Sequence, residues 1–222
     1  MAEQLLLDLP VRTALGRDDF FVSDANAAAV AGIDAWQDWP HGKMVLVGPE
    51  ASGKTHLAHV WAAMTSARVV EAETLAEVSP DDIGPALVVE DADQIVGDAA
   101  ETALFHLHNA VLGQGGRLLL TARADPARWP VSLPDLKSRM QQAGVLKLQG
   151  PDDALLSAVM VKLAADRQLA LGPDLISYAV LRMERSFVAA RQLVQAIDAR
   201  ALRDKTRPTK PMIATLLAEL AE

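Results

Sequence analysis

The residues with the clearest chemical meaning lie at positions 48–55, where the chain reads Gly-Pro-Glu-Ala-Ser-Gly-Lys-Thr. This order satisfies Gly-x-x-x-x-Gly-Lys-[Ser/Thr], the pattern of a phosphate-binding P-loop. Gly48 and Gly53 let backbone N–H groups turn inward around phosphate oxygens, and a helix that starts there adds partial positive charge. Lys54 can reach the β- and γ-phosphates, and the Thr55 hydroxyl can bind Mg²⁺. The residues expected to contact the nucleotide are Gly48, Pro49, Glu50, Ala51, Ser52, Gly53, Lys54, Thr55 and His56.

Two acids, Glu90 and Asp91, form a second group of candidate residues. They follow the β-branched apolar run 86–89, which is typical of a buried strand. Paired acids at a strand end beside a P-loop resemble a Walker B element, in which one carboxylate holds the water shell of Mg²⁺ and the other orients an attacking water. We therefore expect a magnesium site at Thr55, Glu90 and Asp91, with Asp91 as a catalytic candidate. Glutamate stands where aspartate is usual, and its longer side chain argues against vigorous ATP hydrolysis.

An alternation of strands and helices must position these residues. The apolar run 43–47 precedes the P-loop as a strand, and a helix follows Thr55. Residues 98–112 carry apolar side chains at helical spacing. Further strands are expected at 68–71, 86–89, 117–121 and 145–148. The pattern predicts an α/β fold with a five-stranded parallel sheet and ligands at the carboxyl ends of the strands.

At Gly150-Pro151 the pattern changes, and only helical periods follow. We expect helices at about 152–168, 174–184, 186–203 and 209–221, punctuated by Gly172-Pro173 and Arg207-Pro208. The predicted organisation is an N-terminal peptide and linker at 1–16, a P-loop core at 17–150 and a small all-helical domain at 151–222.

Composition limits the class of protein. Half of the 222 residues are hydrophobic, which suits a nucleotide-binding core with a small second domain. The absence of cysteine excludes disulfides and thiolate metal sites. No apolar stretch approaches the ~18 residues of a membrane span, and the N-terminus has no basic lead, so a cytoplasmic protein without a membrane partner is expected. A net charge of −8 makes DNA contact weak or indirect, although a basic run at 200–210 could touch phosphates.

Beyond the P-loop, the chain resembles the AAA+ family and, within it, the ATPase core of the replication initiator DnaA. Residues 20–26, Phe-Phe-Val-Ser-Asp-Ala-Asn, are similar to the DnaA segment that seats the adenine, which implies that Phe21 and Val22 contact the base. Residues 132–140, Ser-Leu-Pro-Asp-Leu-Lys-Ser-Arg-Met, resemble box VII, which implies that Arg139 is an arginine finger. The helical domain would then be the AAA+ lid.

Two positions depart from that family pattern. At the second sensor, in 185–191, the arginine of the family is replaced by Val188, and Arg191 lies about one helical turn later. Arg191 either substitutes for the missing arginine or is a solvated surface residue. At the first sensor, Arg123 stands where DnaA has an acid. Both changes favour a protein that holds a nucleotide over a fast ATPase.

The first ten residues distinguish between relatives of the DnaA core. Residues 4–9 read Gln-Leu-Leu-Leu-Asp-Leu, which resembles the sliding-clamp-binding peptide of DnaA-homologous regulators of the Hda group. An extended peptide can place Leu5, Leu7 and Leu9 in apolar pockets while Gln4 forms hydrogen bonds. By itself the hexapeptide also fits an N-terminal strand or tail. We expect a free-standing core, without the oligomerisation and DNA-binding domains of DnaA.

The resemblance implies a regulator of replication initiation. It would bind ADP or ATP with Mg²⁺, dock on the DNA polymerase sliding clamp (β subunit) and promote hydrolysis of DnaA-bound ATP through Arg139. Whether the chain itself hydrolyses ATP is left open. Two alternatives also stay open. One is a self-assembling P-loop ATPase, such as a DnaC-like helicase loader, with homo-oligomers. The other is a DnaA-binding adaptor without a catalytic effect.

Overall fold

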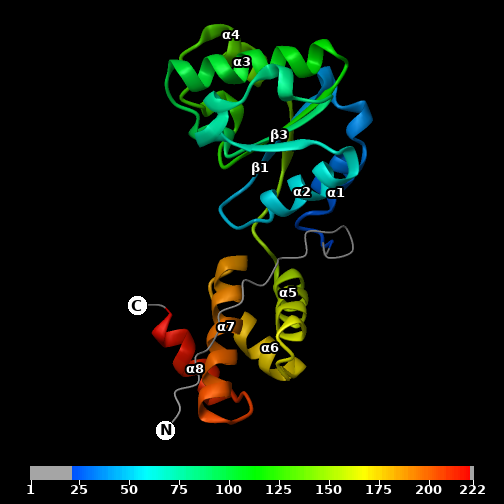
Figure 1. Cartoon of the computed structure of the whole chain (residues 1–222). Helices are drawn as coiled ribbons and strands as arrows, with labels where there is room; N and C mark the ends of the chain where they lie inside the picture. Colours follow the sequence, from blue (N-terminus) through cyan, green and yellow to red (C-terminus); the bar gives the residue numbers. More distant parts are fainter. Residues whose placement is uncertain (1–21, 221–222) are drawn as a thin grey trace.

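The computed structural model describes residues 22–220 as an α/β core followed by a helical domain (Figure 1). The α/β fold with a five-stranded parallel sheet, predicted from the alternation of elements, is confirmed. None of the helices in this described range is long and apolar enough to cross a membrane. The predictions for Gln4, Leu5, Leu7, Leu9 and Phe21 concern residues outside the described range.

The five strands lie in the order β2-β3-β4-β1-β5, and every neighbouring pair is parallel. The central strands β1 and β3 are buried at every position, as expected for a parallel sheet that is covered on both faces. The last strand begins and ends one residue earlier than the expected 145–148. The strands are β1 (Lys43–Val47), β2 (Arg68–Glu71), β3 (Ala86–Glu90), β4 (Arg117–Ala122) and β5 (Gly144–Lys147).

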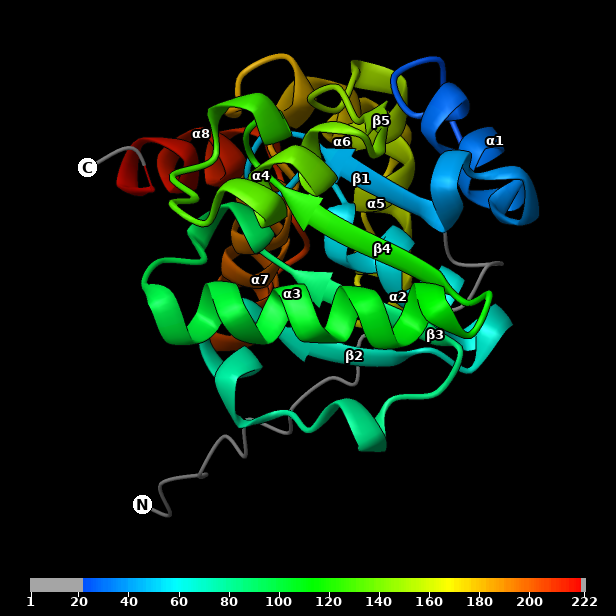
Figure 2. The same ribbon diagram turned by 90° about the horizontal axis from the view of Figure 1, so that it is seen from above.

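Helices cover the two faces of the sheet, and alternate strand residues point to each (Figure 2). On β4, Leu118 and Leu120 belong to the core beneath α3 and α4, whereas Leu119 belongs to the core beneath α1 and α2. Figure 1 shows α3 and α4 on the side of the sheet that faces away from the helical domain. These helices are α1 (Ala27–Asp34), α2 (Lys54–Thr65), α3 (Asp98–Gly113) and α4 (Pro134–Gln141).

Three tryptophans pack together in the core on one face of the sheet. Trp39 stacks on Trp61 with ring centroids 5.1 Å apart, and Trp36 meets Trp61 edge-on at 6.5 Å. Although dispersed in the sequence, these three rings therefore gather on one face of the sheet. They fix α2, the helix that begins at the P-loop, against the segment before β1.

The helical domain has its own apolar core, formed by residues from all four of its helices. Side chains cap three of these helices: Asp152 accepts from Leu155 N, Ser186 from Ala189 N and Thr209 from Met212 N. The second helix is shorter than the expected 174–184. The helices are α5 (Asp153–Asp166), α6 (Pro173–Val180), α7 (Phe187–Asp204) and α8 (Lys210–Glu219).

Candidate functional site

The P-loop joins β1 to α2 at the carboxyl edge of the sheet, and its glycines are required by the local geometry. A Cβ atom on Gly48 would lie 2.6 Å from the Ser52 hydroxyl and 3.0 Å from the Leu148 carbonyl oxygen. Gly53 has a φ of 93°, which residues with a side chain rarely adopt, and it directly precedes the first turn of α2. The backbone N–H groups of that turn face the loop, so the arrangement suits an anion.

Lys54 is folded back into the loop that it follows. Its ammonium group donates to the carbonyl oxygens of Gly48 at 3.0 Å and of Pro49 at 2.9 Å. Burial lowers the pKa of this lysine, while the nearby Asp91 carboxylate acts in the opposite direction. The side chain is thus held at the mouth of the phosphate cradle. The Ser52 hydroxyl in the same cradle is buried and has no hydrogen-bond partner, which fits a loop shaped for a polar ligand.

Glu90 is bound directly to the P-loop. The Thr55 hydroxyl donates to Glu90 Oε2 at 2.7 Å, and His59 Nε2 lies 3.6 Å from Oε1. The Glu90 side chain is buried at the end of β3, opposite Glu71 of β2. Burial raises the pKa of Glu90, the Thr55 hydrogen bond opposes this rise, and the Glu71 charge adds to it. The structure therefore brings together Thr55 and Glu90, two hard oxygen donors of the kind that Mg²⁺ prefers.

Asp91 leaves the strand with a left-handed backbone, at a φ of 51°, and its N–H donates to the buried Thr121 hydroxyl at 2.9 Å. The next acid, Asp93, was not among the predicted site residues. Its carboxylate accepts from the backbone N–H groups of Arg123 (2.9 Å) and Ala124 (3.1 Å) and so fixes the loop after β4. The Asp-x-Asp spacing directly after the strand was the available signal, because a second acid so close to the strand end can reach the loop after the neighbouring strand.

A cleft of about 680 Å³ separates the P-loop from helices α5 and α7 of the helical domain. Arg191 lines it together with Val188, so the two second-sensor candidates share one wall. Arg191 is exposed and faces this cleft, so the expectation that it substitutes for the missing arginine stays a prediction. Val22 is exposed and is not among the lining residues. The lining residues include Asn26, Glu50, Ala51, Ser52, Gly53, Lys54, Thr55, His56, Leu155, Val159, Leu163 and Phe187.

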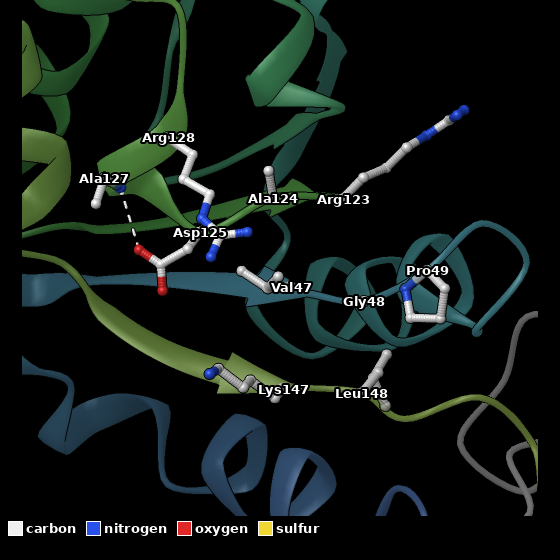
Figure 3. Close-up of a pocket in the computed structure, with 10 residues that line it drawn as sticks. All are labelled: Val47, Gly48, Pro49, Arg123, Ala124, Asp125, Ala127, Arg128, Lys147 and Leu148. Atoms are coloured by element: carbon white, nitrogen blue, oxygen red, sulfur yellow. Dashed lines mark hydrogen bonds between the residues drawn. The ribbon is translucent and has the colours of Figure 1, made fainter.

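A second cleft, of about 640 Å³, lies on the other side of Gly48 and Pro49, among the ends of β1, β4 and β5 (Figure 3). Its charged lining residues are Arg123, Arg128, Lys147 and Asp125. Asp125 accepts from Ala127 N at 3.1 Å and shapes the short helix there. Figure 3 shows the Arg123 side chain extending away from the other labelled residues, and its guanidinium group pairs with Glu50 of the P-loop at 3.1 Å. This first-sensor arginine is therefore tied to the P-loop.

Arg139 lies far from the P-loop of its own chain. Its guanidinium group contacts α3, where Nη1 donates to Asn109 Oδ1 at 2.7 Å and lies 3.4 Å from His108 Nδ1. His108 in turn contacts Lys43, the first residue of β1, whereas the P-loop follows the last residue of that strand. Five strand residues span about 16 Å, so Arg139 lies near the amino ends of the strands and the P-loop lies at their carboxyl ends.

The basic run near the C-terminus is largely paired. Arg200 binds both carboxylate oxygens of Glu219, Arg203 pairs with Asp204, and Lys210 lies 3.7 Å from Asp174. These pairs lie at the surface of the helical domain. They leave the expectation of weak or indirect DNA contact as a prediction.

Comparison with solved structures identifies the architecture. Domain III of the replication initiation protein DnaA from Thermotoga maritima aligns with a TM-score of 0.81 and 17% identity, over 95% of this chain and 98% of that chain. AMPPCP-bound DnaA from Aquifex aeolicus gives 0.68 and 15%, over 84% and 66%. The RuvB Holliday junction branch migration motor of T. maritima gives 0.69 and 16%, over 92% and 72%. No protein-family model matches the sequence.

These likenesses define the class of fold. The chain has the AAA+ architecture, with a parallel α/β core and an appended helical domain. Within that class, the form is that of DnaA domain III, whose structure is matched over nearly the full length of both chains. Because the sequence identities are 15–17%, the comparison establishes the fold, and the function has to be argued from the site.

Proposed function

We propose that the chain binds an adenine nucleotide with Mg²⁺ in the cleft between the P-loop and the helical domain. The observation that carries this proposal is the shared cleft of about 680 Å³, in which a fully formed phosphate loop faces Arg191 and apolar residues of α5 and α7. The loop and the N-terminus of α2 suit the phosphates, and the apolar wall suits the base. An AMPPCP-bound DnaA with the same fold supports the adenine assignment.

Different residues of the site would bind the phosphates and the metal ion. Lys54 would exchange its two carbonyl partners for phosphate oxygens, which are stronger partners for an ammonium group. Thr55 and the Glu90–Asp91 pair would hold Mg²⁺, which neutralises phosphate charge when bound. Because Glu90 is buried and already bonded to Thr55, we assign the chain a nucleotide-holding role with ADP as the expected occupant.

Calorimetric titration of ADP and ATP, with and without Mg²⁺, tests this site. We expect Lys54→Ala to abolish binding. Lys137→Ala removes an exposed lysine on α4 and serves as the matched control, with an unchanged affinity expected. Equal affinities of wild type and Lys54→Ala would refute the assignment.

We further infer a regulatory role toward DnaA of the kind known for the Hda group, in which Arg139 acts on ATP bound by DnaA. The observation that supports this role is the separation of the two sites. Arg139 lies near Lys43 at the amino end of β1, a strand about 16 Å long whose carboxyl end leads into the P-loop, and this position fits a role toward a nucleotide on another molecule. A guanidinium group is permanently charged and its planar fork matches phosphate oxygens. An arginine supplied in trans typically contributes ~10³-fold or more to phosphate release.

Phosphate release from ATP-loaded DnaA, with sliding clamp and DNA present, tests the regulatory role. Wild type should stimulate release, and Arg139→Ala should bind its own nucleotide yet fail to stimulate. A non-catalytic adaptor would block DnaA assembly without stimulating release. A self-assembling ATPase would instead hydrolyse ATP without DnaA and form nucleotide-dependent oligomers in analytical ultracentrifugation.

Docking on the sliding clamp through residues 4–9 completes the proposal, and it rests on the sequence pattern alone. The paired change Gln4→Ala with Leu5→Ala should remove clamp binding in surface plasmon resonance and leave nucleotide affinity intact. The two sites lie on separate segments, so their effects should be independent. If the double variant binds the clamp as well as wild type, residues 4–9 are not the clamp-binding peptide.

A further inference from the structure

Helix α4, which carries Arg139, is anchored to α3 at its first end by a buried carboxylate. Glu101 accepts from the backbone N–H groups of Ser132 (3.0 Å) and Leu133 (2.7 Å) and from the Ser132 hydroxyl (3.2 Å). Burial alone would raise the pKa of Glu101, but these hydrogen bonds outweigh it and lower the pKa below its ordinary range. The start of α4 is therefore held by charge-assisted bonds, which are among the stronger ones in proteins.

The other end of α4 is held through Arg139 itself. Its Nη1 donates to Asn109 Oδ1 at 2.7 Å, and its guanidinium carbon lies 4.8 Å from the centre of the Phe105 ring. Glu101, Phe105 and Asn109 follow one another at intervals of four residues, so they form a single stripe along α3. One face of α3 thus fixes both the helix and its arginine.

A buried lysine and histidine hold Asn109 in turn. Lys43 Nζ lies 3.2 Å from His108 Nε2, and His108 Nδ1 lies 3.3 Å from Asn109 Oδ1. Because an ammonium group can only donate, Nε2 is the acceptor, and the neutral ring carries its proton on Nδ1. That proton is donated to Asn109 Oδ1, which therefore accepts from both His108 and Arg139. The amide is fixed with its oxygen toward the guanidinium group.

All the groups that hold Arg139 are neutral. They are an amide oxygen and an aromatic face, and the amide is held in turn by His108, whose pKa is lowered to about 4, chiefly by burial and then by the Lys43 charge. Within residues 22–220, no carboxylate forms an ion pair with Arg139. Lys43, a second cation, lies close enough for its charge and that of Arg139 to repel each other, and this repulsion adds to burial in lowering the pKa of Lys43. Two cations therefore lie near each other, and Arg139 has no ion-pair partner among the described residues, which favours an anion from another molecule.

We propose that Asn109, fixed by His108 and Lys43, is a positioning residue that holds the Arg139 guanidinium group in place without neutralising it. Asn109, Phe105 and Arg139 together form what we call the Arg139 cradle. Its ligand is a phosphate oxygen of a nucleotide bound by a second protein, so the proposal rests on the proposed function. A carboxylate at position 109 would hold the arginine equally well but would cancel the charge that the partner needs. Replacing the Asn109 amide nitrogen by a carboxylate oxygen therefore keeps the contact that holds Arg139 but neutralises its charge.

The substitution Asn109→Asp makes that separation. Phosphate release from ATP-loaded DnaA is measured against the concentration of added protein, giving a maximal rate and a half-saturating concentration. We expect a melting temperature equal to or above that of wild type, a half-saturating concentration within about twofold, and a maximal rate lower by ~10-fold or more. Gln114→Glu adds the same charge at an exposed position near the end of α3 and should retain the full rate.

Two further variants keep the test decisive. Asn109→Ala removes the acceptor without adding charge and should lower the maximal rate at an unchanged half-saturating concentration. In an Arg139→Ala background, Asn109→Asp should have no further effect on the rate, because both changes act through one group. A full maximal rate from folded Asn109→Asp or Asn109→Ala protein overturns this inference alone. Failure of wild type to stimulate overturns the proposed function together with it.

Discussion

His108 makes the core sensitive to acid in a way that can be measured. The ring is 4% exposed, and burial, the Lys43 charge and the Arg139 charge together lower its pKa from 6.5 to about 4. A histidine with a lowered pKa binds its proton more tightly in the unfolded chain, so acidification favours unfolding between these two values. The full difference between these two pKa values corresponds to about 3 kcal/mol in the free energy of unfolding. About 2 kcal/mol of this should be lost between about pH 7 and pH 4.5.

The substitution His108→Gln removes this titration while keeping a neutral acceptor for Lys43. We expect the free energy of unfolding of wild type, measured relative to the variant, to fall by about 2 kcal/mol over that pH range. Urea titrations followed by tryptophan fluorescence report on the relevant part, since all four tryptophans precede residue 130 and lie in the core. The helical domain then does not contribute to the signal, which simplifies the two-state treatment.

Exposed His106, on the opposite side of α3, provides the control. His106→Gln should follow the wild-type pH dependence, so that only the buried ring accounts for the difference. A wild-type and a His108→Gln protein whose unfolding free energies run parallel from neutral to acid pH would refute the reasoning. In that case His108 would not be held neutral by its neighbours, and the tautomer inferred for the Arg139 cradle would fail as well.

Three other outcomes follow from the geometry. Gly48→Ala should abolish nucleotide binding in calorimetry because its Cβ would lie 2.6 Å from the Ser52 hydroxyl, whereas Gly113→Ala, with open space around its Cβ, should bind normally; normal binding by both would contradict the tight approach. Glu101→Gln should lower the free energy of unfolding by about 2 kcal/mol and the melting temperature by roughly 4–8 °C, since one of the two acceptor oxygens becomes an NH2 group that cannot accept from the buried donors, while the exposed Glu77→Gln should change little. The Glu101 contribution should also be lost as pH falls through its lowered pKa, and a pH-independent Glu101→Gln deficit would exclude this charge effect. Arg191→Ala should weaken ADP binding by ~3–10-fold if this cleft residue contacts phosphate, with Arg182→Ala, stacked on Tyr178, as the unaffected control.

Much of the core could be predicted from sequence because its signals are local. The P-loop requires Gly48 and Gly53 for steric reasons that hold in any context, and β1 follows from an apolar run that is buried on both faces. Glu90 was also located correctly, because it ends a strand beside that loop. Boundaries were less certain where the element is at the sheet edge: β5 is half exposed and lies one residue earlier than its apolar run suggested.

The residues that hold Arg139 could not be found in this way. Asn109 and Lys43 are 66 residues apart in the chain, and the buried lysine has the same sequence appearance as an exposed one. His106 and His108 are two residues apart, which places them on different faces of a helix, and the structure has the first exposed and the second buried. What the sequence lacked was the partner of each, because a parallel sheet joins segments that are distant along the chain.

The two candidate sites lie at opposite ends of the parallel strands. Strand β1 ends in the P-loop and begins at Lys43, so one strand connects the nucleotide cradle to the Arg139 cradle. A conformational change at the P-loop would have to pass through a strand that is buried at all five positions, and a packed element couples two sites only where it has two discrete arrangements. We therefore expect Asn109→Asp to leave the affinity for ADP unchanged, which calorimetry can establish. A shift in ADP affinity by tenfold or more, about 1.4 kcal/mol, would show that the P-loop and the Arg139 site are coupled. The bound nucleotide would then control the position of Arg139.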